Sequence, residues 1–275
     1  MDTIETLLTR QDMGTAYAEG LSRESLKQLT PAAYAEAPHE KLSSRYAFLP
    51  TSAVIDTMDR AGFTVVEARQ SKSRKRLPAY APHALRFRQR CTEVYVGEVV
   101  PEILVLNSHD GSSAYHVRVA LYRAICTNGM IVSDTALPAW KVAHRGSAAA
   151  EVLEAAMDLV GRFKEVGTLI ERMRGTFLTE ERRLRFASDA LRLRYPDEPP
   201  GMAVAPADLL KPGRVEDEGL DVWHTMNVIQ EHIIRGGVKR RTASNRIVQM
   251  RGVRAIREDV RLNVGLWDRA MHEIA

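Results

Sequence analysis

The hydrophobic pattern of this chain changes its period once, and that change constrains the fold more than any other feature of the sequence. Between residues 64 and 124, short runs rich in β-branched and aromatic residues are typical of strands. After Ser133, apolar residues recur at helical spacing with few helix breakers. We therefore predict an α+β fold whose N-terminal half holds a mostly antiparallel sheet, with strands at 64–69, 83–90, 93–100, 103–107 and 113–124, packed with long helices at 148–175 and 180–194.

The same patterns divide the chain into four parts. They are a helical lead-in at 1–45, an α+β core at 46–195, a proline-rich loop at 196–219, and a helical C-terminal module at 220–275 that packs on the core.

Local signals place several helix ends. Ser22 and Thr51 can each cap a helix in the first part of the chain. Near the C-terminus, the pair Gly236–Gly237 separates a helix at 220–235 from one or two helices at 244–274. The dipeptide Asn128–Gly129 predicts a tight turn.

Positive charge is concentrated in two tracts of a chain whose net charge is only +4. Residues 69–90 and 235–257 together hold 16 of the 39 Lys and Arg residues and no Asp or Glu, which leaves 23 basic against 35 acidic residues elsewhere. Clustered cations on an otherwise acidic chain indicate an electrostatic binding surface, because spreading them would reduce self-repulsion. The pattern favours a polyanion as the partner.

The first tract combines a loop with a strand. Along 83–90 the arginines alternate with apolar residues, so a strand places its arginines together on one face. The loop before it adds cations near Tyr80, which can combine phosphate neutralisation with base stacking. The alternative is a solvated hairpin whose charges pair with acidic residues of the helices. The nucleic-acid-binding residues predicted here are Arg69, Lys72, Arg74, Lys75, Arg76, Arg86, Arg88 and Arg90.

The second tract places two glycines after a helix and three consecutive cations before the next one. Such a turn can direct backbone N–H groups at an anion, although the spacing of a P-loop is absent. A flexible, charged joint between helices is the alternative. The predicted nucleic-acid-binding residues of this tract are Arg235, Lys239, Arg240, Arg241 and Arg246.

No recognisable catalytic constellation accompanies these tracts, and the sequence predicts no cofactor and no metal. Cys91 and Cys126 are too few for a disulfide framework or a zinc site, which predicts thiols in a reducing cytoplasm. The sequence His–Asp–Gly at 109–111 is typical of a turn. An i,i+4 ion pair explains the presence of Glu231 and Arg235 without a catalytic role. No apolar run is long enough to span a bilayer, so no membrane partner is expected.

Several short motifs occur together in one order. They are NSHDGSSA at 107–114, RAICTNGM at 123–130, Trp223 with NVIQE at 227–231 and RGG at 235–237, and NVGLW at 263–267. In combination they resemble the domain of unknown function 932 family of phage- and plasmid-associated proteins, over roughly residues 45–270. The resemblance implies a setting among bacterial mobile elements and carries over no catalytic residues. The motif residues are Asn107, His109, Asp110, Arg123, Asn128, Gly129, Asn227, Gln230, Glu231, Gly236, Gly237, Asn263 and Trp267.

The leading hypothesis is a non-catalytic protein of phage or plasmid origin that binds single-stranded or unpaired DNA through both tracts, in an annealing or protection role. The order of helix and sheet is also similar to single-strand annealing proteins, which work as rings or filaments, so a homo-oligomer is a further prediction. A protein-interaction or anti-host module that meets an acidic host protein is the first alternative. A metal-dependent hydrolase built around His109, Asp110 and His116 is the second.

Overall fold

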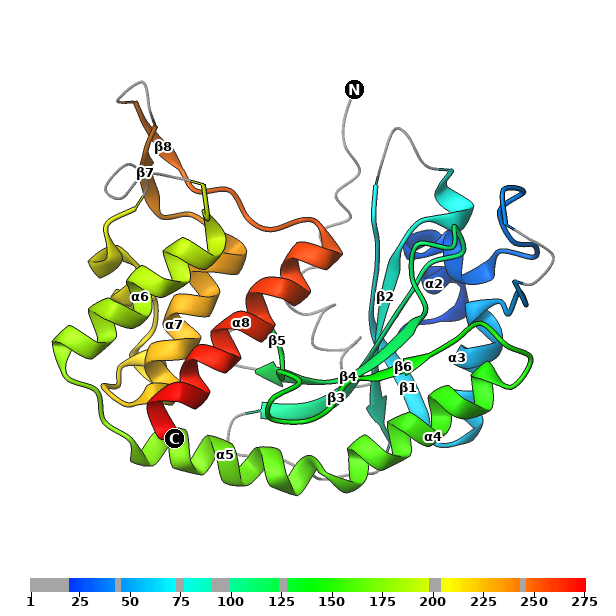
Figure 1. Ribbon diagram of the computed structural model, residues 1–275, viewed down its shortest axis with the longest axis horizontal. Coiled ribbons are helices and arrows are strands. Elements are labelled where there is room, and N and C mark those ends of the chain that lie inside the picture. The colour runs from blue at the N-terminus through cyan, green and yellow to red at the C-terminus, as the bar shows by residue number, and fades with distance from the viewer. Residues whose placement is uncertain are drawn as a thin grey trace. The chain divides into compact units, whose positions relative to one another are not determined.

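The computed structural model describes residues 20–42, 46–72, 77–90, 99–123, 128–197, 204–242 and 246–275. It confirms the α+β class, with an antiparallel sheet in the N-terminal half and a helical C-terminal part. Within these residues the sheet order is β1 (Phe63–Gln70), β2 (His83–Gln89), β3 (Val99–Asn107), β4 (Tyr115–Arg123) and β5 (Asn128–Ile131), and β6 (Trp140–Val142) pairs with β4 (Figure 1).

One face of β2 and β3 belongs to the hydrophobic core. The register pairs His83 with Asn107, Leu85 with Val105 and Phe87 with Ile103, so these side chains share a face. Helix α3 (Thr51–Arg60) buries Val54, Ile55 and Met58. Its N-cap is Pro50 and no side chain caps it, so the prediction that Thr51 caps this helix is wrong.

Contacts divide the chain into two compact units. Unit 1 comprises Met1–Glu93, Glu102–Arg118 and Trp140–Asp158, and unit 2 comprises Val94–Pro101, Val119–Ala139 and Leu159–Ala275. Strands β3 and β4 and helix α4 (Ala148–Gly161) continue from one unit into the other. Unit 1 also contains α2 (Arg23–Leu29), where the Ser22 hydroxyl accepts a hydrogen bond from the Ser25 N–H, which confirms the predicted cap.

Unit 2 is mainly helical. Its helices are α5 (Phe163–Gly175), α6 (Glu180–Arg194), α7 (Val222–Arg235) and α8 (Ile256–Ile274), with short 3₁₀ turns at Pro206–Leu210 and Val215–Asp217. Helices α7 and α8 pack side by side (Figure 1), and between them the Trp223 and Trp267 rings meet edge to face at a centroid distance of 6.4 Å. Among the described residues, no helix combines the length and apolar character that crossing a membrane requires.

Three local predictions fail. A two-stranded sheet of β7 (Lys239–Arg241) and β8 (Ile247–Gln249) replaces the first part of the helix predicted at 244–274. Asn128 and Gly129 begin β5 and pair with β4, so they do not form the predicted turn. The predicted helix at 148–175 is interrupted at Arg162, which lies between α4 and α5.

Candidate functional site

The arginines of β2 share one face of the sheet, but acidic residues of the neighbouring strands neutralise them. Glu67 of β1 is the cross-strand partner of Arg86, and the Arg86 Nε lies 3.1 Å from a Glu67 carboxylate oxygen. The two oxygens of the fully buried Glu102 carboxylate pair with Arg86 and Arg88 at 3.3 and 2.7 Å. The expected cationic face is therefore wrong for Arg86 and Arg88, because a tract without acids in sequence receives them from β1 and β3.

Two further arginines of the first tract also pair with acidic side chains. Arg90 Nη1 lies 2.7 Å from Asp59 of α3, and Arg69 Nε lies 3.6 Å from Glu67. Lys72 is exposed. The predicted residues Arg74, Lys75 and Arg76 lie outside the described residues, as do Cys91 and Cys126. Where the structure describes this tract, the alternative of paired charges fits it better than a cationic surface.

The second tract lies on the β7–β8 hairpin and in the segment that follows it. The register pairs Lys239 with Gln249 and Arg241 with Ile247, so these four side chains share one face, which is exposed to solvent. Arg240 lies on the other face. Figure 1 shows the hairpin extending from the end of α7, away from α6 and α7.

Several cations of this hairpin region keep their charge available. Lys239, Arg246, Arg251 and Arg254 are exposed, and in the described part of the chain no acidic side chain pairs with them. Two other predicted residues of the tract have structural partners, because Arg240 lies 4.8 Å from the centroid of the Tyr195 ring and Arg235 Nη1 lies 3.3 Å from Glu231. The second tract therefore offers fewer available cations than the sequence predicted. We call Lys239, Arg246, Arg251 and Arg254 the hairpin cations.

The two glycines hold the hairpin and do not present their N–H groups to an anion. The Gly236 N–H donates to the His232 carbonyl at 2.9 Å, and the Gly237 N–H donates to the Met250 carbonyl at 2.8 Å. The predicted anion-binding turn is therefore wrong. Gly236 has a φ of +76°, and a Cβ there would lie 2.2 Å from the Met250 oxygen, so only glycine allows the hairpin to approach the end of α7 this closely.

The motif residues Asn107 and His109 belong to a buried polar cluster in unit 1 that is centred on Thr51. Asn107 Nδ2 donates to Thr51 Oγ1 at 3.0 Å, and His109 Nε2 lies 3.2 Å from the same oxygen. His83 Nε2 lies 2.9 Å from it, while His83 Nδ1 donates to the Ala81 carbonyl at 3.0 Å. Because that bond leaves Nε2 as the acceptor, the Thr51 hydroxyl donates to His83 and accepts from Asn107 and His109.

This environment keeps the histidines neutral. Burial lowers the pKa of His83 to about 4, and burial together with the neighbouring His83 and His144 lowers the pKa of His109 to about 3. His109 Nδ1 and Asn107 Oδ1 are buried acceptors to which no group of the described residues donates a hydrogen bond. A hydroxyl bonded to an imidazole is the geometry of a nucleophile and its base. Thr51 is fully buried and its hydroxyl is already saturated, so we assign the cluster to stability.

The residues proposed for a hydrolase are not brought together. His116 follows Tyr115 on β4, and neighbouring strand residues face opposite sides, so His116 points away from the cluster that Tyr115 joins. Asp110 Oδ1 accepts from the Ser112 N–H at 3.0 Å, and Gly111 has a φ of +77°, which is turn chemistry. In the ranges that the structure describes, no group of three His, Cys, Asp or Glu side chains is arranged to hold a metal ion.

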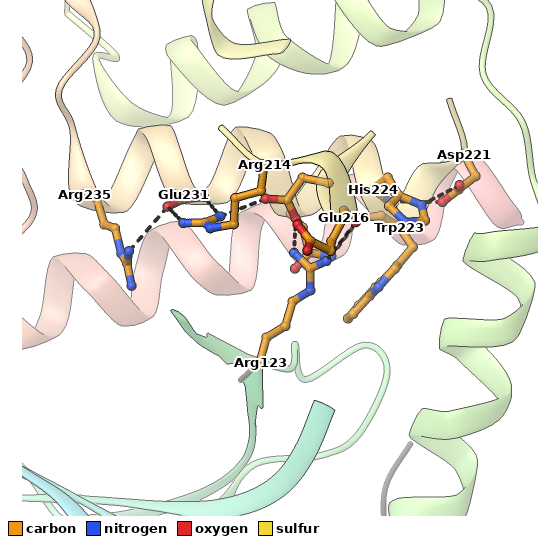
Figure 2. Close-up of polar contacts among 10 residues, drawn as sticks. Arg123, Arg214, Glu216, Asp221, Trp223, His224, Glu231 and Arg235 are labelled. Carbon is orange, nitrogen blue, oxygen red and sulfur yellow. Dashed lines mark hydrogen bonds and ion pairs between the residues drawn. The ribbon is translucent and has the colours of Figure 1, made fainter. Parts of the chain in front are cut away.

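A ladder of opposite charges connects motif residues in unit 2 (Figure 2). Arg123 pairs with Asp217, and both side chains are buried. Arg214 lies 2.7 Å from Asp217 and 2.6 Å from Glu231, which also meets Arg235 at 3.3 Å and so confirms the predicted i,i+4 pair. Burial raises the pKa of Asp217, but the hydrogen bonds and charges of Arg123 and Arg214 outweigh it and lower that pKa. The ladder ties the segment before α7 to β4 and α7.

The remaining motif residues meet in the same unit. Gln230 Nε2 donates to Asn263 Oδ1 at 2.9 Å and to the Gly129 carbonyl at 3.3 Å, which links α7, α8 and β5. Asn263 Nδ2 donates to Asp259 Oδ1 at 2.7 Å, and Asn227 Nδ2 donates to the Trp223 carbonyl at 2.7 Å. Gln230 thus connects three motifs that are far apart in sequence through hydrogen bonds, while the Asn227 bond is local to α7.

One pair capable of acid–base chemistry, Asp221 and His224, was not predicted from the sequence. Asp221 Oδ1 accepts from the His224 N–H at 3.0 Å as the N-cap of α7, and Asp221 Oδ2 lies 2.6 Å from His224 Nδ1 (Figure 2). The spacing of a capping Asp and a residue three positions later is the signal that could have found it. Within the described residues, no hydroxyl or thiol is hydrogen-bonded to His224 Nε2, so the pair lacks a nucleophile and serves as a cap.

Comparison with known proteins identifies relatives over most of the chain. A family model described as "Domain of unknown function (DUF932)" matches residues 38–267. The UPF0380 protein YfjQ of Escherichia coli (strain K12) is 34% identical over 248 residues, which cover 90% of this chain and 89% of that protein. The UPF0380 protein YafZ of the same strain is 34% identical over 250 residues, with the same two coverages. No solved structure matches.

Proposed function

This chain belongs to the domain of unknown function 932 family, and we propose that it is a non-catalytic protein that binds single-stranded or unpaired DNA through the hairpin cations. An annealing or protection role, a phage or plasmid origin and a cytoplasmic location are parts of this proposal. The observation that carries it is the set of exposed cations, Lys239, Arg246, Arg251 and Arg254, that no described acid neutralises.

The contrast between the two tracts supports the proposal. Arg86 and Arg88 of β2, and Arg90 just after it, each meet a carboxylate, so these charges are neutralised within the fold. Of the hairpin cations, Lys239 lies on the two-stranded ribbon, Arg246 lies just before β8, and Arg251 and Arg254 lie in the segment that follows it. The self-repulsion of these like charges brings no structural gain. A polyanion relieves this repulsion and releases its own counterions. Binding would be led by the phosphate backbone and tolerant of sequence, because these contacts carry no base information.

A binding experiment with matched variants tests the proposal. The hairpin variant carries Lys239→Gln, Arg246→Gln, Arg251→Gln and Arg254→Gln. The control variant loses the same charge from exposed positions elsewhere, through Arg145→Gln, Lys164→Gln, Arg185→Gln and Arg192→Gln. Fluorescence anisotropy of a labelled single strand measures affinity at low salt.

We expect the hairpin variant to lose at least about tenfold in affinity, and the control variant to bind as the unmodified protein does. Equal losses in the two variants would show a dependence on net charge alone and would refute the assignment to the hairpin. No binding by the unmodified protein, together with co-purification of a stoichiometric acidic protein, would refute DNA binding and favour the protein-interaction alternative.

A further inference from the structure

The end of helix α6 contacts the first strand of the β7–β8 hairpin. Tyr195 directly follows α6, and its N–H donates to the Leu191 carbonyl at 2.8 Å, so its backbone is fixed to the helix. The guanidinium carbon of Arg240, on β7, lies 4.8 Å from the centroid of the Tyr195 ring, and that of Arg194 lies 5.4 Å from the same centroid. The ring therefore holds one cation of the hairpin and one of the helix.

The segment that follows β8 is connected to the same helix end. Arg194 Nη2 donates to the Arg251 carbonyl at 3.4 Å, and Arg194 Nη1 lies 3.4 Å from a Glu258 carboxylate oxygen of α8. Two consecutive residues at the end of α6 thus contact both β7 and the segment after β8. Those two stretches carry Lys239, Arg251 and Arg254 of the hairpin cations.

Arg240 points toward Tyr195 and away from the outer face of the ribbon. The register pairs it with Val248, on the face opposite Lys239 and Gln249. Its Nε atom is buried, and its planar guanidinium can stack on a ring as a lysine ammonium cannot. The quadrupole of an aromatic ring stabilises a cation held against its face. Arg240, which the sequence placed among the nucleic-acid-binding residues, is therefore suited to holding the hairpin against α6.

We propose that Tyr195 is a positioning residue, which sets the orientation of the hairpin through Arg240 and so fixes how the hairpin cations are presented to a DNA strand. The inference rests on the proposed function and deepens it. Cations whose spacing is fixed beforehand bind a polyanion more tightly, because less conformational freedom is lost on binding. Tyr195 and Arg240 thus raise the affinity without contacting DNA.

Three substitutions and a matched control separate positioning from charge. Tyr195→Leu removes the ring, Tyr195→Phe keeps it, and Arg240→Gln removes the cation that lies on it. The control is Tyr34→Leu in unit 1, because Tyr34 is also a half-buried tyrosine, with Lys27 Nζ 5.6 Å from the centroid of its ring. Hydrogen exchange of the hairpin amides, measured without DNA by mass spectrometry, reports how firmly the hairpin is held. Anisotropy of a labelled single strand at several salt concentrations gives the affinity and its salt slope.

We expect Tyr195→Leu and Arg240→Gln each to speed the exchange of the hairpin amides and to weaken DNA binding by about fivefold. The double variant should bind no more weakly than either single variant, because both changes break the same contact. The salt slope should stay that of the unmodified protein in all three, since no phosphate contact is lost. Tyr195→Phe and Tyr34→Leu should match the unmodified protein in both measurements.

Unchanged exchange in Tyr195→Leu would overturn the inference, and so would faster exchange with unchanged affinity. A shallower salt slope in Arg240→Gln would also overturn it, because that residue would then contact a phosphate. Failure of the unmodified protein to bind DNA would instead refute the proposed function. The two failures are distinguishable, because the exchange measurement does not depend on DNA.

Discussion

The buried histidines of unit 1 make the stability of the protein depend on pH in a way that one substitution can test. His83 and His109 have folded-state pKa values of about 4 and about 3, below the ordinary value of 6.5. Between pH 6.5 and the folded-state pKa values, the unfolded chain binds more protons than the folded one. The contribution of the two histidines to the free energy of unfolding is therefore full above pH 6.5 and is lost as the pH falls towards those values. From about pH 8 to about pH 5, each histidine accounts for a loss of about 2 kcal/mol.

Replacing one histidine isolates its share of this loss. His109→Gln retains an N–H that can donate to Thr51 Oγ1 but cannot titrate, so the fall in the free energy of unfolding between about pH 8 and about pH 5 should shrink by about 2 kcal/mol. Urea unfolding followed by far-ultraviolet circular dichroism at both pH values measures the difference, and a lower stability of the variant at both values does not affect it. His272→Gln, at an exposed position of α8, is the control. An unchanged pH dependence in His109→Gln would refute the assignment of a depressed pKa to this residue.

Three further perturbations follow from the contacts. Asp217→Asn leaves Arg123 buried without its counter-charge and should lower the free energy of unfolding by about 3 kcal/mol, whereas the exposed Glu216→Gln should change it by less than about 0.5 kcal/mol in the same urea titration. Thr51→Val removes the hydroxyl shared by the polar cluster and should cost about 2 kcal/mol, and thermal unfolding should show Thr51→Ser to be the milder change. Gly236→Ala forces a Cβ against the Met250 carbonyl, so limited proteolysis should cut the displaced hairpin faster than in the unmodified protein, and equal cleavage rates would contradict the close approach.

Periodicity was sufficient to predict the fold class and several helices. The helix predicted at 180–194 is α6 residue for residue, because its caps and its apolar spacing are local signals. The β7–β8 hairpin was not predicted, because its strands KRR and IVQ are too short to show the two-residue alternation of a strand. They also carry no turn dipeptide such as Asn–Gly. Its pairing depends on the contact between Gly236 and the Met250 backbone, which no local pattern encodes.

The two basic tracts show where a charge pattern along the sequence is not enough to predict a binding surface. Alternation correctly placed Arg86 and Arg88 on one face, but their partner Glu102 lies on a different strand, and strand pairing alone brings it opposite them. The cluster around Thr51 has the same origin, because the register that pairs His83 with Asn107 assembles it. Charge counts along a chain therefore predict a binding surface only where the fold supplies no acids.

The dependence of DNA affinity on salt is the most direct test of the claim that the hairpin cations bind DNA. Four phosphates neutralised on a single strand predict a slope of log affinity against log salt of about −3 between about 50 and 200 mM salt. The hairpin variant, with Gln at positions 239, 246, 251 and 254, should show a slope near zero, and the charge-matched control variant should keep the slope of the unmodified protein. A slope that the hairpin substitutions leave unchanged would contradict the account.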